Sequence, residues 1–151
     1  MKKTLLAFLL VALSIPSMAQ QGYEYKVITI VESIVPMGIG RSRIVENKTE
    51  MDVTKFTTSR TDGKDSSQGD VDRSDAKIGM FDETKLLNFY SGVGINFQNV
   101  ASNDALITSK INNLVTDGWE LAFALSGVES DAGKEDGKGI YITRLIFKKK
   151  K

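Results

Sequence analysis

Histidine and cysteine are both absent from this chain of 151 residues. Without histidine, the Ser-His-Asp and Cys-His catalytic systems and the commonest general base are excluded. Without cysteine as well, zinc, copper, haem and iron–sulfur sites lack their usual ligands, which leaves oxygen-ligated calcium or magnesium. No disulfide can form, so the fold must be stabilised by its core alone. We therefore expect no cofactor and no metal site.

An excess of charge of either sign is also lacking. The 20 basic and 19 acidic residues almost cancel, so the molecule has no overall field that attracts it to DNA, RNA or an anionic membrane. We expect no nucleic-acid partner.

Residues 1–19 have the pattern of a secretory signal peptide. Two lysines precede an apolar run from Leu5 to Leu13, and Ser17-Met18-Ala19 places small residues at the cleavage positions. The apolar run is much shorter than the ~20 residues that cross a bilayer. We therefore expect residues 20–151 to be one periplasmic or secreted domain that is not inserted in the membrane after cleavage.

The segment from Ser102 to Phe123 predicts a helix followed by a strand. Ser102, Asn103 and Asp104 offer side-chain oxygens that suit a helix N-terminus, and Gly118 suits the left-handed conformation that ends a helix. Between them, apolar residues recur at helical spacing and form one face. These residues are Ile107, Ile111, Leu114 and Val115.

After Gly118 the apolar period changes to two, which predicts a strand. Trp119, Leu121, Phe123 and Leu125 are expected on one face of this strand, and Glu120 on the other, solvated or paired across strands. Because the helix and the strand each have one apolar face, we expect them to pack together with Trp119 in the core.

Other segments rich in β-branched and aromatic residues predict further strands. The first of these segments, Tyr23–Val35, has apolar residues on both sides, so we expect an inner strand that is covered on both faces for part of its length. Residues 92–97 predict a strand with glycine bulges, and residues 82–90 fit either a strand or a short helix. The other predicted strands are Arg41–Glu46, Glu50–Phe56 and Gly139–Lys148.

Residues 60–77 form a different kind of segment, because nine of the 18 are charged. Such a segment buries too little apolar surface to offset its ordering entropy, so we expect a mobile loop and favour disorder over a functional loop. Asp70-x-Asp72-x-Ser74 begins like a calcium loop, but Asp75 and Phe81 replace the required glycine and glutamate. A solvated acidic loop is the better interpretation.

Two glycine-rich segments are candidates for ligand binding, since both place bare backbone beside apolar or basic side chains. Neither completes the dinucleotide fingerprint, and a turn or bulge is the more ordinary interpretation of each. If a ligand is bound, we expect it to contact Gly38, Gly40, Arg41, Arg43, Gly92, Gly94 and Asn96.

The motifs YEYKV at Tyr23–Val27 and INNLVTDGWEL at Ile111–Leu121, with a last strand ending in Phe147-Lys148, resemble a small bacterial family of unknown function. The resemblance implies a compact antiparallel sheet on one helix, in strand–helix–strand–strand order, with residues 36–101 as an insertion. It implies no catalytic residues.

Taken together, the sequence predicts a single α+β domain with an antiparallel sheet of about five strands packed against one main helix. The first functional hypothesis is a non-catalytic exported protein that binds an envelope protein or a small ligand. The alternatives are a hydrolase using carboxylates or a Ser/Lys pair, and a homo-oligomer that associates through a strand edge. A pocket that joins two carboxylates with a shifted pKa would favour the enzyme, and a flat apolar patch or an uncapped edge strand would favour binding or assembly.

Overall fold

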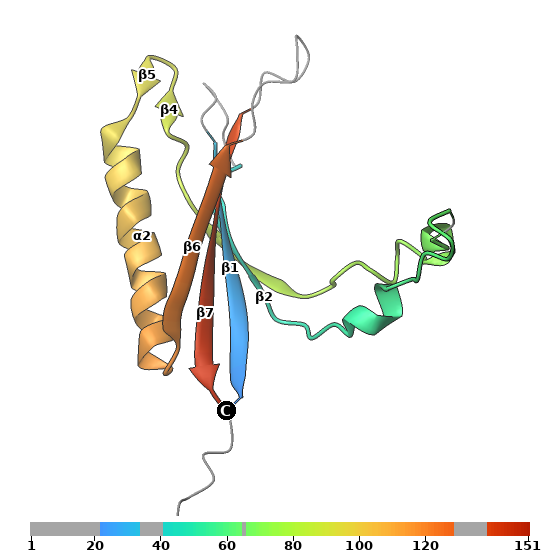
Figure 1. The fold of residues 1–151 in the computed structure, drawn as a ribbon. Coiled ribbons are helices and arrows are strands. Elements are labelled where there is room, and N and C mark those ends of the chain that lie inside the picture. The colour runs from blue at the N-terminus through green and yellow to red at the C-terminus, as the bar shows by residue number, and fades with distance from the viewer. Residues whose placement is uncertain (1–21, 34–40, 65, 129–138) are drawn as a thin grey trace, which may run out of the picture.

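The computed structural model describes residues 22–33, 41–64, 66–128 and 139–151, so the predicted signal peptide at 1–19 lies outside the described residues. Five strands form one antiparallel sheet in the order β3-β2-β1-β7-β6, with the helix α2 (Phe97–Thr116) beside it (Figure 1). This arrangement confirms the predicted α+β fold. The strands of the sheet are β1 (Tyr23–Ser33), β2 (Arg43–Asn47), β3 (Phe81–Lys85), β6 (Glu120–Val128) and β7 (Ile140–Lys150).

The core lies between α2 and one face of the sheet. Trp119 is 8% exposed and Leu114 is buried with it, while Ile107 and Ile111 pack against the same cluster. Val115, predicted on this apolar face, is instead exposed. The sheet and Leu86, the residue after β3, contribute the remaining buried apolar side chains. Those of the sheet are Ile28, Ile30, Ile44, Leu145 and Phe147.

Helix α2 begins six residues before the predicted cap. Asn96 is the actual N-cap, and its side chain accepts a hydrogen bond from the Asn99 backbone N–H at 3.2 Å. Residues 92–97 are not the single strand that was predicted. They contain the turn and the second strand of a short hairpin, formed by β4 (Tyr90–Ser91) and β5 (Gly94–Ile95), and the first residue of α2. The glycine stop is confirmed, because Gly118 has a φ of +85°.

A β-bulge in β6 changes which side chains face the core. Leu121 pairs with Phe147 of β7, but Phe123 pairs with the next residue, Ile146, so Ala122 is extra. The bulge reverses the alternation. The prediction that Phe123 and Leu125 share a face with Trp119 is therefore wrong, since both lie on the face of the sheet opposite α2.

Strand β1 is an inner strand, as predicted, because it pairs with both β2 and β7. Ile28 and Ile30 are buried under α2. On the other face, Tyr25 and Val27 are exposed, Val31 is half-buried and Ser33 is buried. The predicted cover on both faces for part of the length is therefore limited to the end of β1 near Ser33.

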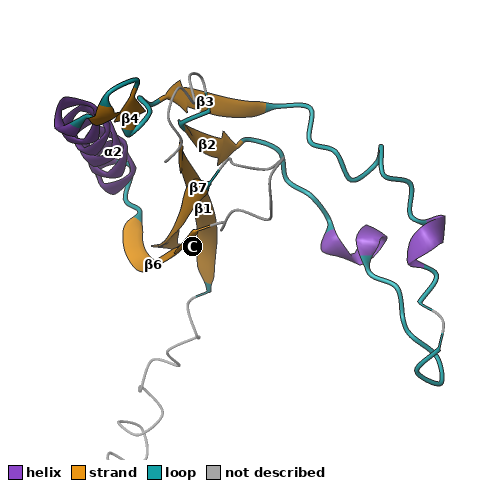
Figure 2. Ribbon diagram, turned by 90° about the horizontal axis from the view of Figure 1, so that it is seen from above, coloured by secondary structure: helices purple, strands orange, loops and turns teal. Residues whose placement is uncertain are grey.

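Residues 48–80 form an arm that leaves the sheet between β2 and β3 (Figures 1 and 2). The predicted strand at Glu50–Phe56 is wrong. It is replaced by a 3-10 helix, η1 (Val53–Phe56), because the Asp52 carboxylate accepts hydrogen bonds from the backbone and hydroxyl of Thr54. A second 3-10 turn, η2 (Gln68–Asp70), interrupts the predicted loop at 60–77, whose mobility stays a prediction.

Within the described ranges, no helix is long and apolar enough to span a membrane.

Candidate functional site

The residues predicted to bind a ligand have structural roles in the part of the chain that the structure describes. Arg43 lies on β2 and forms an ion pair with Glu83 of β3 at 2.6 Å, and Arg41 is half-buried just before β2. Asn96 caps α2. The described glycines, Gly92 and Gly94, lie in the β4–β5 hairpin, and Gly94 has a φ of +131°.

Gly38 and Gly40 lie outside the described residues, so the ligand assignment of the first segment stays a prediction. Arg43 and Asn96 serve different elements, a strand of the main sheet and the start of α2.

Glu46 is the most heavily paired charge on the helix side of the sheet, and sequence reasoning missed it. It is 3% exposed, and its carboxylate contacts the ammonium groups of Lys26 at 3.1 Å, Lys48 at 3.4 Å and Lys110. Burial opposes its ionisation, but the hydrogen bonds from Lys110 and Lys26 outweigh this effect and lower the pKa of Glu46 to about 2. The alternation that places Ile44 in the core also places Glu46 there, which is the signal that the sequence contained.

One lysine of this cluster, Lys26, also contacts Trp119, and its ammonium lies 4.9 Å from the centroid of the ring. Lys149 of β7, which is not part of the cluster, lies 5.9 Å from the same centroid. Both distances are within the range of cation–π attraction. Lys26 thus links the ion pair to the core, so the cluster is best explained as a stabilising network.

Asn103 of α2 is the centre of a second buried set of polar contacts. Its side-chain oxygen accepts a hydrogen bond from the Leu87 N–H at 2.7 Å, and its amide donates to Leu87 C=O at 2.8 Å and to Glu32 at 3.0 Å. Burial raises the pKa of Glu32, the Asn103 hydrogen bond opposes this shift, and Asp104 adds to it. Asn103 therefore fastens the segment after β3 to the helix.

The two unusual carboxylates do not share a cleft. Glu46 pairs in register with Ile28, and Glu32 lies four residues further along β1, a separation of roughly 13 Å along a strand. The buried side chains of Ile30 and Ile44 lie between them. Since a general acid–base pair must meet at one substrate, this geometry does not favour the hydrolase hypothesis.

Asp70, Asp72 and Asp75 of the arm line one open hollow of about 600 Å³, and Lys55 and Lys77 line it with them. Asp72 accepts hydrogen bonds from the Ser74 backbone and hydroxyl, which is an ordinary local turn. Among the described residues, no group of three or more acidic side chains is placed to hold an ion.

The face of the sheet opposite α2 is the most distinctive surface of the molecule, and we call it the open face. It carries exposed apolar side chains from β1 and β6, which flank β7, including Tyr25 (61% exposed), Phe123 (62%) and Leu125 (59%). The register places further apolar residues among them on the same face. These are Val27 and Val31 of β1, Val45 of β2, and Ile142 and Ile146 of β7.

A shallow hollow interrupts the open face at Gly127 of β6. Its volume is about 330 Å³, and Leu125, Ile142 and Arg144 line it. The missing side chain at Gly127 leaves room beside an arginine whose guanidinium lacks an ion-pair partner within the described ranges. The register also places the ion pairs Arg43–Glu83 and Lys148–Glu120 on this face. The face therefore offers a depression beside Arg144 within a surface that carries both apolar and charged side chains.

The outer edges of the sheet are less suited to pairing than the open face. The β6 edge contains the bulge at Ala122, and the β3 edge carries Asp82, Glu83 and Lys85. Bulges and charged side chains are the usual devices that prevent edge-to-edge association.

Compared with models of protein families, with curated proteins and with solved structures, this chain gives no match. Its resemblance to the bacterial family with the YEYKV strand and GWEL turn therefore stays a prediction.

Proposed function

We propose that this protein is a non-catalytic exported protein that docks a protein partner in the cell envelope through the open face of its sheet. The observation that carries the proposal is the exposure of Phe123 and Leu125 beside Tyr25 on one side of the sheet. A monomer rarely exposes a contiguous apolar surface of this kind without a partner.

The shape of the open face supports a protein partner rather than a small ligand. Small-molecule sites bury most of their ligand in a concave pocket, whereas the exposed apolar residues here lie on β1 and β6, on either side of β7. Aromatic side chains such as Tyr25 and Phe123 are also the residues that most often anchor protein interfaces.

The electrostatics of the helix side support a non-catalytic role. The pKa of Glu46 is about 2, so this carboxylate stays ionised at neutral pH and is poorly matched to general acid or base catalysis. Its lysine partners are held in the same ion-pair network.

Site-specific photo-crosslinking in cells that export the full chain tests the proposal. A photoreactive phenylalanine analogue at Phe123 is expected to form protein adducts in the envelope. The matched control is the same analogue at Ser109, which is exposed on α2 and should give none. Absence of protein adducts from position 123, or equal adducts from both positions, would contradict the proposal.

A further inference from the structure

We infer that the partner docks by adding an extended peptide segment to a free edge of β1, beside the arm. This inference rests on the proposed function and names the kind of segment that the partner supplies. We call the space beside this edge the edge slot. It is a hollow of about 570 Å³, with Glu24–Val27 of β1 on one side and Asn47–Met51 and Ile78 on the other.

The free edge exists because β2 covers only part of β1. β1 pairs with β7 along its whole length, from Tyr23 to Ser33, but β2 pairs only with residues 28–31. At the end of β2, the Asn47 side chain accepts a hydrogen bond from the Thr49 N–H at 2.9 Å and donates one to the Thr49 carbonyl at 2.6 Å. This local turn directs the chain away from β1 and into the arm, while β1 and β7 extend beyond that point (Figure 1).

The backbone of the uncovered part of β1 presents hydrogen-bonding groups to the slot. The Gly22 carbonyl accepts a hydrogen bond from the Lys151 N–H on the β7 side, and the Ser33 N–H donates to the Ser42 hydroxyl on the β2 side. Since backbone groups alternate sides along a strand, the odd-numbered residues of β1 direct their N–H and C=O towards the β2 side. At Tyr25 that side has no ladder partner among the described residues. Its N–H and C=O are therefore available to an added strand.

The usual protections of a strand edge are missing at this part of β1. Proline or a bulge would block an added strand, and Tyr23–Val27 contains neither. A lysine can also protect an edge, but the Lys26 ammonium is directed to Glu46 at 3.1 Å and to the Trp119 ring at 4.9 Å. The edge of β1 therefore differs from those of β6 and β3, which a bulge and charged side chains protect.

The two faces of β1 define the pattern of the added segment. On the open face, Tyr25 and Val27 are exposed, and Met51 of the arm borders the slot across from them. On the face towards α2, the slot is bordered by the charged residues Glu24 and Lys26. Because side chains alternate along a strand, we expect a segment with apolar residues at every second position and polar residues between them. The arm stands across the slot from β1, so the slot suits a single extended chain rather than the edge of a second sheet.

Hydrogen exchange of the exported protein, measured by NMR, tests whether the edge is free. The Tyr25 N–H is expected to exchange at least about tenfold faster than the Lys26 N–H, which is directed to β7. Equal protection of these two amides would overturn the inference, because another part of the chain or a second copy would then occupy the edge.

A displayed library of random peptides, selected on the full exported chain, supplies the probe for binding. The selected peptide is expected to protect the Tyr25 N–H from exchange. Tyr25→Pro should weaken its binding by roughly tenfold or more relative to Tyr25→Ala, because both lose the tyrosine side chain but only proline lacks the N–H. Circular dichroism confirms that both variants are folded. Failure to select a peptide that protects this N–H, or equal binding by the two variants, would overturn the inference.

Photo-crosslinking from position 123 separates this inference from the proposed function. In cells, the protein adducts should decline in Tyr25→Pro and persist in Tyr25→Ala. Equal adduct yields from the two variants would overturn strand addition alone and leave the proposed function standing. Absence of adducts from the wild type would contradict the proposed function, whereas a peptide that protects the Tyr25 N–H in the purified protein would still support the added strand.

Discussion

Glu46 and Glu32 are two partly or fully buried carboxylates on the same face of the sheet, in opposite electrostatic environments. Lysine hydrogen bonds lower the pKa of Glu46 to about 2 despite its burial, whereas burial raises the pKa of Glu32. Because a shifted pKa couples ionisation to folding, these residues should give the stability of the protein opposite dependences on pH.

We predict that Glu46→Gln lowers the free energy of unfolding at neutral pH by about 2 to 3 kcal/mol. The folded pKa is depressed, so this stabilisation is present above the ordinary glutamate value of 4.5 and is lost as the pH falls towards 2. The difference between wild type and variant should therefore shrink over that range. Urea unfolding at a series of pH values measures it.

Glu32→Gln is the matched control, for which we predict the opposite dependence of stability on pH. The pKa of Glu32 in the folded protein is raised above 4.5. The wild type therefore loses stability as the pH rises above 4.5, and the variant should become more stable relative to the wild type over that range. A Glu46→Gln difference that is constant from neutral pH down to pH 2 would contradict the assigned ion pairs.

At the scale of the element, the bulge in β6 decides which side chains reach the open face. Leu121 faces α2 and Phe123 faces away because Ala122 is an extra residue between them. The same bulge weakens the strand edge as a template for pairing. One inserted alanine thus places Phe123 and Leu125 on the open face, where the proposed docking of a partner needs them.

We predict that deleting Ala122 is tolerated, because Leu121 and Phe123 keep their facing partners, Phe147 and Ile146, when the ladder becomes regular. Deleting Ala124 should instead turn Leu125 and the residues after it to the wrong face and cost roughly 2 kcal/mol or more. Thermal unfolding of both deletion variants measures the difference. Equal losses would show that the bulge does not set the faces of β6.

The elements governed by local chemistry were predictable from the sequence. Gly118 ends the helix with a positive φ and Trp119 enters the core, as the local pattern indicated. The helix start was not predictable in the same way, because Asn103 resembles a cap. Its side-chain amide instead forms hydrogen bonds with the backbone N–H and C=O of Leu87, which lies 16 positions earlier in the chain.

The candidate site was less predictable than the fold for the same reason. Phe123 and Leu125 continue the alternation that starts at Trp119, so the sequence favours placing them in the core. Their exposure depends on the bulge and on which face α2 covers, and both are tertiary features. The apolar residues on both sides of β1 indicated cover on both faces for part of the strand, and the exposure of Tyr25 and Val27 shows that the first half of the strand is covered on one face.

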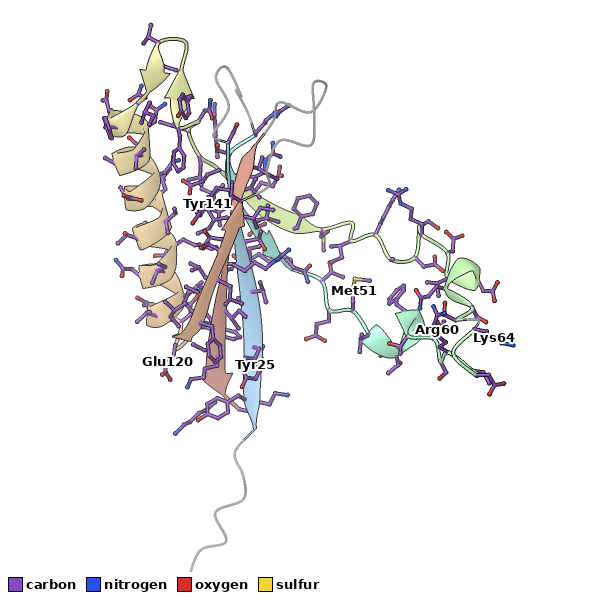
Figure 3. All side chains as sticks on the ribbon, turned by 45° about the horizontal axis from the view of Figure 1, so that its top comes forward. Tyr25, Met51, Arg60, Lys64, Glu120 and Tyr141 are labelled. Atoms are coloured by element: carbon purple, nitrogen blue, oxygen red, sulfur yellow. The ribbon has the colours of Figure 1, made fainter. Side chains whose placement is uncertain are left out.

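At the scale of the whole molecule, the helix, the sheet and the arm form an asymmetric body with one covered face and one open face. Figure 3 shows Tyr25 on β1, Met51 at the start of the arm, and Arg60 and Lys64 towards its far end. The exposed apolar side chains of the open face are the feature of the whole molecule on which the proposed docking of a partner rests.

The chain contains no cysteine, so a single introduced thiol reports on one position without interference. The most direct measurement compares the rates at which a maleimide modifies Leu125→Cys on the open face and Ser109→Cys on α2, in the intact envelope. If a partner covers the open face, Leu125→Cys should react at least about tenfold more slowly than Ser109→Cys, and unfolding the protein should remove the difference. Equal rates in the intact envelope would contradict the claim that the open face is the working surface of this protein.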